Sequence, residues 1–266
     1  MREYIVSVDI AAKRDRYAEI VMRDIIQTVQ GAPEVGIPDR WVHTYQIVWA
    51  KQQERMRYDQ MEDSTLSLVG RPDLRNNCEL LVDGTGVGDP FVEHLRGRNA
   101  YPVPIIFTSG GSVHDVYDDA GHVFGEWADR LSVKTLKEIR VPKKDLVSAG
   151  ALMLQQHRLI IGKKIKHKDA LVAQLNGFRG EVNKQTGRIR YEAEFEELHD
   201  DLIVCYLMAA WWAIVRRPIL AERELPAVGA VRVRSSASWE PAELDNALIR
   251  DTEEQGPPHQ VVQSWR

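Results

Sequence analysis

The chain has 266 residues, of which 44% are hydrophobic and 28% are charged. This composition is typical of a folded globular protein and excludes a disordered or fibrous chain. The length predicts one large or two small domains, and one domain followed by a tail fits the pattern best. Cys78 and Cys205 are far apart and lie in apolar runs, so we expect two buried thiols rather than a disulfide scaffold or a zinc site.

The net charge of −4 excludes a uniformly basic chain, but the charge is distributed unevenly. Between Lys134 and Arg190 there are 14 Lys and Arg residues against 4 Asp and Glu residues, so this segment carries +10 and the remainder carries −14. Such a segment suits a polyanion, although a solvated surface is the alternative. The residues that we expect to contact nucleic-acid phosphates are Lys163, Lys164, Lys166, Lys168, Arg179, Lys184, Arg188 and Arg190.

The distribution of hydrophobic residues does not suggest a membrane protein or a secreted protein. The first residues enter a strand pattern at once and lack the basic-then-apolar layout of a signal peptide, so we expect a cytoplasmic location. The longest apolar run, residues 202–215, is shorter than the roughly 20 residues that a membrane span needs. We interpret it as a buried helix and expect no membrane association.

The first quarter of the chain predicts three strands and a helix. Residues 4–10 and 17–26 are rich in β-branched residues and are separated by a charged turn, which indicates a hairpin. After a loop rich in glycine and proline, residues 41–49 predict a third strand. A weak helical pattern covers residues 52–68.

The next segment has the order strand, glycine loop, helix, strand. Residues 78–82 form a short apolar run that leads into the glycine-rich residues 83–88. Residues 90–98 predict a helix with proline in its first turn, and residues 101–107 predict a further strand. Residues 108–125, rich in glycine and aspartate, are expected to form a loop.

The last part of the folded region is mainly helical. Residues 142–157 and 167–178 predict two helices, and residues 182–192, which are centred on a glycine-bearing turn, predict a β-hairpin. Residues 198–216 predict a long, almost entirely apolar helix. The two tryptophans of this helix, Trp211 and Trp212, are expected in the core rather than as platforms for base stacking.

The composition changes at residue 217. Proline, serine and mixed charge dominate residues 217–266, which we expect to form a flexible tail. The predicted folded domain therefore comprises residues 1–216. The fold class expected for it is α/β, with strands and helices alternating along much of its length.

Acidic residues lie at the ends of three apolar elements. Asp9 ends the first strand, Asp83 follows the strand at residues 78–82, and the pair Asp200 and Asp201 precedes the apolar helix. A carboxylate at a buried strand end must be paired, hydrated or bound to a metal, because an isolated buried charge is strongly disfavoured. If the first two strands are parallel neighbours, both carboxylates emerge at the same carboxyl edge, where open α/β sheets place their ligands.

Oxygen ligands of this kind suit Mg²⁺ or Mn²⁺. Two such ions roughly 4 Å apart can activate a water molecule and stabilise the leaving oxygen of a phosphodiester, so the predicted chemistry is phosphodiester hydrolysis. Taken singly, Asp9 and Asp83 could be turn residues, and Asp200 and Asp201 could favour the helix dipole. Together and in this order, the acids favour a metal site.

The glycine loop after Asp83 has a second interpretation as a phosphate cradle. It lacks both the Gly-x-Gly-x-x-Gly spacing and a P-loop lysine. We therefore favour a tight turn that allows a close approach of the backbone to the metal cluster or to DNA.

Three segments together resemble a known family. Val-Asp-Ile-Ala-Ala at residues 8–12, Leu-Val-Asp-Gly-Thr-Gly-Val-Gly-Asp-Pro at residues 81–90 and His-Asp-Asp-Leu-Ile at residues 199–203 are similar to the three nuclease motifs of phage large terminases. The resemblance covers about residues 4–215. It implies an RNase H-like fold, with a central mixed sheet of five or more strands flanked by helices and an extra β-hairpin. It also implies an endonuclease that cuts concatemeric viral DNA during genome packaging.

The resemblance assigns roles to individual residues. Asp9, Asp83 and Asp201 would be catalytic metal ligands, with Asp200 as a supporting ligand and two Mg²⁺ or Mn²⁺ ions as cofactors. The implied partners are double-stranded DNA, a packaging ATPase, the small terminase and the portal protein, and the implied location is the host cytoplasm. In many relatives another aspartate follows a few residues later, whereas this chain has Leu-Ile-Val-Cys at residues 202–205, which puts a fourth ligand from this helix in doubt.

Some questions stay open at the level of sequence. These residues contain no Gly-x-x-x-x-Gly-Lys-Ser/Thr loop of a packaging ATPase, so the chain is either an excised domain or a separate nuclease. The alternatives for its function are a nuclease similar to Holliday-junction resolvases, an actin-like phosphate-binding ATPase domain, and a docking module that binds DNA or a portal.

Overall fold

The computed structural model describes residues 2–10, 16–31, 40–85, 88–119, 134–182, 189–193 and 200–217. Within these ranges the chain alternates between strands and helices, as expected for an α/β protein. The elements are β1 (Tyr4–Asp9), β2 (Arg16–Val29), β3 (Arg40–Glu54), α1 (Tyr58–Val69), β4 (Cys78–Asp83), α2 (Gly88–Gly97), β5 (Val103–Thr108), β6 (His114–Asp119), β7 (Lys134–Pro142), α4 (Lys143–Gln155), β8 (Leu159–Ile161), α5 (Lys168–Gly177), β9 (Phe178–Val182), β10 (Ile189–Ala193), α6 (Asp201–Trp211) and the π-helical turn η2 (Trp212–Arg216).

Eight strands form one mixed sheet in the order β6-β7-β5-β4-β1-β2-β3-β8, and β9 and β10 form a separate hairpin. β2 is antiparallel to both β1 and β3, whereas β4 runs parallel to β1 and β5 runs parallel to β4. Because β1, β4 and β5 are parallel, their carboxyl ends lie at one edge of the sheet. We call this edge the carboxyl edge.

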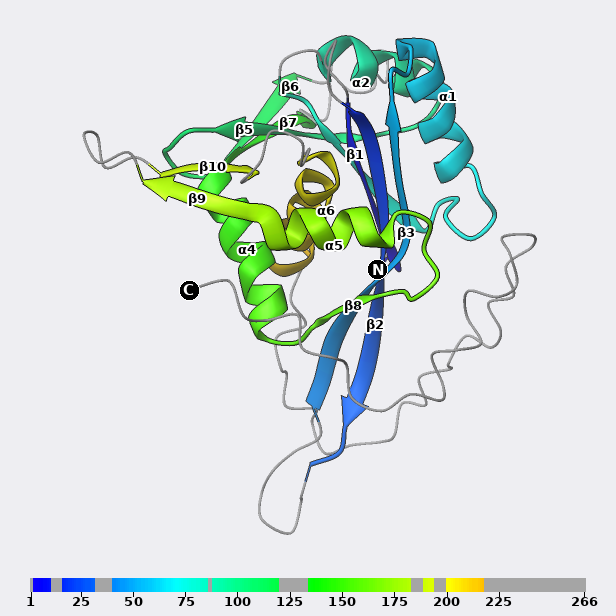
Figure 1. Ribbon diagram of the computed structural model, residues 1–266. Coiled ribbons are helices and arrows are strands. Elements are labelled where there is room, and N and C mark those ends of the chain that lie inside the picture. The colour runs from blue at the N-terminus through cyan, green and yellow to red at the C-terminus, as the bar shows by residue number, and fades with distance from the viewer. Residues whose placement is uncertain are drawn as a thin grey trace.

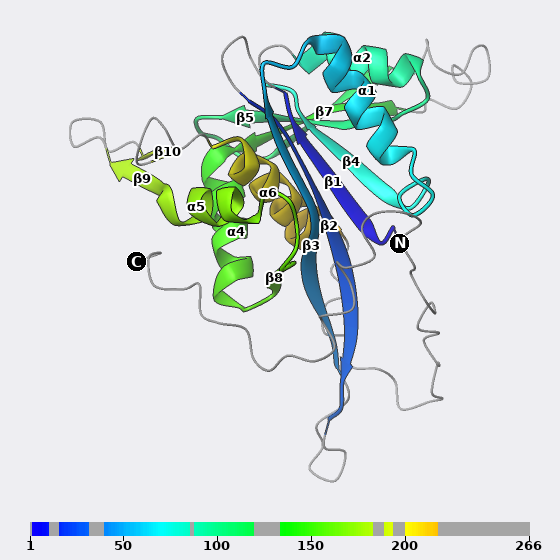
Figure 2. The same ribbon diagram turned by 45° about the vertical axis from the view of Figure 1, so that its right-hand side comes forward.

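Helices cover both faces of the sheet (Figure 1, Figure 2). α4, α5 and α6 lie on one face, and α1 and α2 lie on the other. Because side chains alternate along a strand, each strand contributes to both cores. In β1, Ile5 belongs to the core beneath α6, whereas Val6 and Val8 belong to the core beneath α1 and α2.

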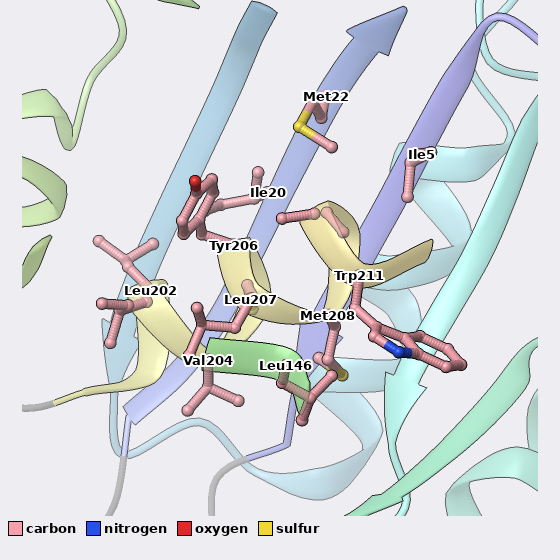
Figure 3. Packing of buried hydrophobic residues seen from close by; sticks show 14 of the residues in the cluster. Ile5, Ile20, Met22, Leu146, Leu202, Val204, Tyr206, Leu207, Met208 and Trp211 are labelled. Atoms are coloured by element: carbon pink, nitrogen blue, oxygen red, sulfur yellow. The ribbon is translucent and has the colours of Figure 1, made fainter. Parts of the chain in front are cut away.

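α6 is the central helix of its face, and every one of its residues is buried. Figure 3 shows its side chains packing on Ile5, Ile20 and Met22 of the sheet. α4 packs closely against it at Gly150, where an added Cβ would lie 2.5 Å from a Leu207 side-chain carbon. The expected apolar helix is confirmed, and Trp211 is fully buried within it as predicted.

Several predicted elements need correction. The first helix begins at Tyr58 rather than near residue 52, because β3 continues to Glu54. The segment expected to be a loop contains β6, and β7 was also not predicted. Both lie at one side of the sheet and are rich in charged residues, so their pairing with neighbours rather than their composition makes them strands. Cys205 is buried as expected, but Cys78 is only partly buried.

The expected domain boundary falls beside a buried residue. Arg217, the first residue assigned to the tail, is 4% exposed and lies 2.8 Å from a carboxylate oxygen of Asp24 and 2.9 Å from one of Glu79. The structure therefore places Arg217 with the folded domain. Residues 218–266 lie outside the described ranges, so the flexible tail stays a prediction.

No helix in the described part of the chain is both long and apolar enough to cross a membrane.

Candidate metal centre

The parallel pairing of β1 and β4 brings Asp9 and Asp83 to the same place. Val8 is the register partner of Val82, so the next residues in the two strands are Asp9 and Asp83 at the carboxyl edge. Neighbouring strands are about 4.8 Å apart, and residues two positions apart share a face. Both aspartates therefore continue the face of the sheet on which α6 packs, as the sequence predicts for parallel neighbours.

The thiol of Cys205 marks the point at which the candidate ligands meet. Cys205 is fully buried on α6, and burial raises the pKa of its thiol well above the ordinary value. The negative charges of Asp9, Asp201 and Asp83 raise this pKa further. The geometry agrees with this: the Cys205 thiol donates to the carbonyl of Ala18 at 3.4 Å, and Ala18 is the register partner of Asp9. Cys205 also lies one helical turn after Asp201 on α6. Strands β1 and β4 and helix α6 thus contribute one acidic side chain each.

The pKa of Asp83 is affected by burial and also by Asp200, the other acid at the start of α6. Burial is the largest cause that raises the pKa of Asp83, and the charge of Asp200 raises it further. Hydrogen bonds from Thr85 and the charge of Lys143 act in the opposite direction, with the Thr85 N–H donating to Asp83 at 2.7 Å. The ionised form of Asp83 is thus disfavoured by its surroundings, as expected for a carboxylate in an acidic cluster.

Asp201 and Asp200 have different surroundings at the start of α6. Asp201 is the first residue of the helix, is 5% exposed, and accepts a hydrogen bond from the Gln52 side-chain amide at 2.8 Å. Asp200 occupies the N-cap position but makes no capping hydrogen bond. Gln174 of α5 supplies that cap, because its side-chain oxygen accepts from the backbone N–H groups of Leu202 and Ile203.

The acids at the carboxyl edge fit a hard divalent cation by the chemistry of their donors. Carboxylate oxygens are the ligands that Mg²⁺ and Mn²⁺ prefer, and the raised pKa of Asp83 indicates negative charge without full compensation. As they stand, the described residues contain no group of three or more His, Cys, Asp and Glu side chains arranged to hold a metal ion. The acids are therefore a candidate site by the chemistry of their oxygen atoms and by their place at the ends of β1 and β4 and at the start of α6.

The residues expected to bind DNA are only partly described. Lys163, Lys164 and Lys166 are exposed in the loop between β8 and α5, and Lys168 begins α5. Arg179 is in β9 and Arg190 is in β10, but their side chains are not described. Two further expected contacts, Lys184 and Arg188, lie outside the described residues.

The loop that carries Lys163, Lys164 and Lys166, here called the lysine loop, comes close to the carboxyl end of β3. The pKa of His167 is lowered first by burial, and then by the positive charges of Lys166 and Lys51. Lys51 precedes Gln52 in β3, and Gln52 contacts Asp201. Part of the predicted basic surface therefore lies near the same corner of the fold as the acidic cluster.

Two residues near the acids carry no signal in the sequence pattern. Gln52 and Gln174 are amides in a strand and a helix with no motif around them, and only their tertiary contacts identify them. Lys143 is different, because it lies in the stretch of residues 141–147, whose layout is also similar to that of the family. Its position near Asp83 follows from the parallel pairing of β5 with β7.

The glycine after Asp83 has a packing role. The Gly84 N–H donates to the Ile105 carbonyl at 3.0 Å, and an added Cβ would lie 2.6 Å from a side-chain carbon of Ile106. The residue therefore permits a close approach to β5. The close approach at this glycine is to β5 itself, and the tight turn stays a prediction because residues 86 and 87 lie outside the described residues.

The strand order β3-β2-β1-β4-β5, with β2 antiparallel to its neighbours, is that of an RNase H-like fold. The predicted fold class is therefore confirmed, with a sheet of eight strands and the expected extra hairpin of β9 and β10. The protein is an RNase H-like α/β protein with carboxylates collected at the carboxyl edge of its sheet.

No protein-family model matches the sequence, and no curated protein matches it. Solved structures that match are nuclease domains of the family that the sequence resembles. The large terminase nuclease of thermophilic phage G20c with bound magnesium is 14% identical, with 79% of this chain and 80% of that chain covered and a TM-score of 0.49. A mutant nuclease domain of the large terminase subunit of bacterial virus Sf6, with manganese and β-thujaplicinol, is 15% identical, with 78% and 87% covered and a TM-score of 0.49. The large terminase of bacteriophage HK97 is 10% identical, with 79% and 39% covered and a TM-score of 0.29.

Proposed function

We propose that this chain is a metal-dependent DNA endonuclease that cuts concatemeric viral DNA during genome packaging. The observation that supports it most is the placement of Asp9 and Asp83 at the ends of neighbouring parallel strands, against the helix that begins at Asp201. In this proposal the partners are double-stranded DNA, a packaging ATPase, the small terminase and the portal protein. The nuclease would act in the cytoplasm of the host cell.

Each acidic residue has a role in this proposal. Asp9 and Asp83 would hold two Mg²⁺ or Mn²⁺ ions from neighbouring strands, Asp201 would hold them from α6, and Asp200 would support the cluster beside Asp83. When bound, such ions supply an activated water and stabilise the leaving oxygen of the phosphodiester. The protein contributes fixed positions for the ligands and a partly buried setting in which their charges are poorly screened by water.

Positive side chains provide a path for the DNA backbone toward the acids. Lys163, Lys164 and Lys166 are exposed, and the charge of Lys166 acts at the same corner of the fold as that of Lys51. Basic side chains on phosphates give affinity without reading bases, so the enzyme would cut with little sequence preference. A sharply defined recognition sequence would contradict this part of the proposal.

The direct test is incubation of supercoiled plasmid DNA with the protein and Mn²⁺ or Mg²⁺. Nicked and linear DNA are expected with either ion, and no cleavage is expected in excess chelator or with Asp201→Asn, because the metal site then lacks its cation or one ligand charge. Asp63→Asn, at an exposed acid of α1, is the matched control and should cut as the wild type does. Full activity in excess chelator would overturn the proposal.

The same assay separates the alternatives. A nuclease similar to junction resolvases would cut a four-way junction in strong preference to linear duplex, whereas the proposed enzyme cuts both. An actin-like domain would bind ATP and cut neither.

The DNA path is tested by the dependence of binding on salt. Replacing Lys163, Lys164 and Lys166 by Glu should weaken binding and reduce the slope of log K against log salt by about one for each phosphate that the protein no longer neutralises. Arg75→Glu makes the charge change of one of these three substitutions in an exposed residue near the amino end of β4, and it should leave the slope unchanged. An unchanged slope in the triple variant would place the DNA elsewhere.

A further inference from the structure

Two glutamine side chains connect the start of α6 with the carboxylate of Asp201. Gln174 on α5 accepts hydrogen bonds from the backbone N–H groups of Leu202 and Ile203 at 2.9 and 3.2 Å. Its side-chain nitrogen donates to the side-chain oxygen of Gln52 at 3.4 Å. Gln52 in turn donates to Oδ2 of Asp201 at 2.8 Å. The hydrogen bonds thus form a continuous path from the end of a helix to a candidate metal ligand.

The direction of this path is fixed by its first member. A backbone N–H can only donate, so the oxygen of the Gln174 amide must face α6 and its nitrogen must face away. The nitrogen then requires an acceptor, which turns the oxygen of Gln52 toward Gln174. The nitrogen of Gln52 is left facing Asp201, whose ionised carboxylate can only accept. Neither amide can flip without setting two donors or two acceptors against each other.

Because of these hydrogen bonds, the side chain of Asp200 is not needed to cap α6. An aspartate at the N-cap normally accepts a hydrogen bond from the N2 or N3 amide of its own helix. Here Gln174 takes both of these donors, from Leu202 and Ile203, while Asp200 makes no capping bond. Capping from a neighbouring helix therefore relieves Asp200 of the capping role.

We propose that Gln52 and Gln174 are positioning residues that hold the carboxylate of Asp201 in the orientation needed to bind a divalent cation. This inference rests on the metal-dependent function proposed above. An uncharged donor suits the task, because it orients the carboxylate without neutralising it, whereas a lysine at the same place would compete with the cation. Hydrogen-bond partners of metal ligands commonly change metal affinity about 10- to 100-fold when they are removed.

The chain offers a matched control for this role in the adjacent residue. Gln52 is partly buried and contacts Asp201, whereas Gln53 is exposed and its side chain belongs to the other face of β3. The substitutions Gln52→Met and Gln53→Met therefore remove the same amide from neighbouring positions. Gln52→Asn provides a second variant that stays polar but is one methylene too short to reach Asp201.

The experiment is a titration of each full-length variant with Mn²⁺ in the absence of DNA, followed by calorimetry or by electron paramagnetic resonance. Gln52→Met and Gln52→Asn are expected to raise the Kd for Mn²⁺ about 10-fold, and Gln53→Met is expected to leave it unchanged. Asp201→Ala is measured alongside. If Asp201→Ala binds Mn²⁺ as the wild type does, the proposed metal site itself is wrong. If it loses binding but both Gln52 variants bind normally, the positioning role alone is overturned.

The link between the two glutamines is tested by a double-mutant cycle. Gln174→Met removes the helix cap and one anchor of Gln52, so it should lower the Tm and also weaken Mn²⁺ binding. The double variant Gln52→Met/Gln174→Met should weaken binding less than the product of the two single effects, because both act on Asp201 through one path. Independent effects that multiply, or a lower Tm with an unchanged Kd in Gln174→Met, would show that Gln174 only supports the helix.

Discussion

Buried charged residues lie both at the amino ends of β1 and β4, here called the amino edge, and at the carboxyl edge. The partners of these charged residues differ between the two edges. At the amino edge of β1 and β4, the guanidinium of Arg217 lies within 2.9 Å of carboxylate oxygens of Asp24 and Glu79. At the carboxyl edge, Asp83 and Asp201 accept hydrogen bonds from uncharged donors, a backbone N–H and a glutamine amide. The first arrangement pairs its acids with a buried cation of the chain, whereas in the second these two acids accept hydrogen bonds from neutral groups.

This difference separates a structural cluster from a binding site that has the same residue types. The amino-edge cluster also includes His43, 2.8 Å from Asp24, and the Trp212 indole N–H, which donates to Glu79 at 2.7 Å. Buried acids with so many fixed partners hold elements together. At the carboxyl edge the raised pKa of Asp83 shows that negative charge is still costly there, so binding of a cation would stabilise the protein as well as serve catalysis.

The largest expected effect is on activity at the carboxyl edge. Asp83→Asn should lower the rate of DNA cleavage by at least about 100-fold, more than the decrease usual for a residue that only supports a ligand. It should at the same time raise the Tm in chelator, because it removes a charge that burial and Asp200 disfavour and keeps the acceptor for Thr85. Plasmid cleavage and thermal unfolding of the same preparation measure both. A lower Tm together with full activity would place Asp83 among the structural acids.

At the amino edge the order of effects should be reversed. Arg217→Met should lower the free energy of unfolding by about 3 to 5 kcal/mol, because it leaves the buried carboxylates of Asp24 and Glu79 without their cation. Arg216→Met is the matched control, since this neighbour pairs with Asp115 at a more exposed position and should contribute about 1 kcal/mol or less. Urea unfolding measures both. Equal decreases in the two variants would remove the contrast between the residues.

A pair of truncations sharpens the same contrast. A chain that ends after Ala221 keeps Arg217 and should unfold at nearly the wild-type urea concentration, with cleavage retained. A chain that ends after Arg216 should be destabilised by about as much as Arg217→Met, because it lacks the same guanidinium. If both truncations fold equally well, Arg217 is dispensable and the domain ends where the sequence places its boundary, at Arg216.

The smallest expected effect concerns pH near the lysine loop. The pKa of His167 is lowered, so the folded chain binds this proton less readily than the unfolded chain does. The free energy of unfolding should therefore decrease as the pH falls through the ordinary histidine pKa of about 6.5, and this decrease is complete below the folded-state pKa. His167→Gln should remove that part of the pH dependence. Thermal unfolding between pH 7.5 and about 5 is the measurement, with the exposed His114→Gln as control; an unchanged pH profile in His167→Gln would contradict the assignment.

Much of the fold follows from local sequence patterns. The apolar runs of β1, β4 and α6 are long enough to predict both their type and their burial, and an aspartate ends each of the two strands and begins the helix. Patterns of this kind can be recognised in the sequence because burial on one face fixes the register of a strand and the apolar stripe of a helix. The placement of Asp9 and Asp83 at the same edge of the sheet was therefore within reach of the sequence.

Other features depended on contacts between distant residues. β6 and β7 have too many charged residues for a local strand signal, and they are strands because their neighbours offer hydrogen-bond partners. The amide of Gln52 meets Asp201 across 149 positions of sequence, and Arg217 meets Asp24 across 193. A hydrogen bond or ion pair needs only two atoms in reach, so it has no period along the chain and leaves no pattern to detect.

The sequence by itself determined which residues are buried in the principal strands and helices, and where acids interrupt them. The reason is that buried hydrophobic residues recur along each element with the period of a strand or a helix. Only the tertiary structure decided what each buried charge does. It gave Asp24 and Glu79 an arginine, and it gave Asp201 a glutamine held by a second glutamine. The physical reason is that the cost of a buried charge depends on its partners in space, and those partners are set by how the elements pack rather than by their order.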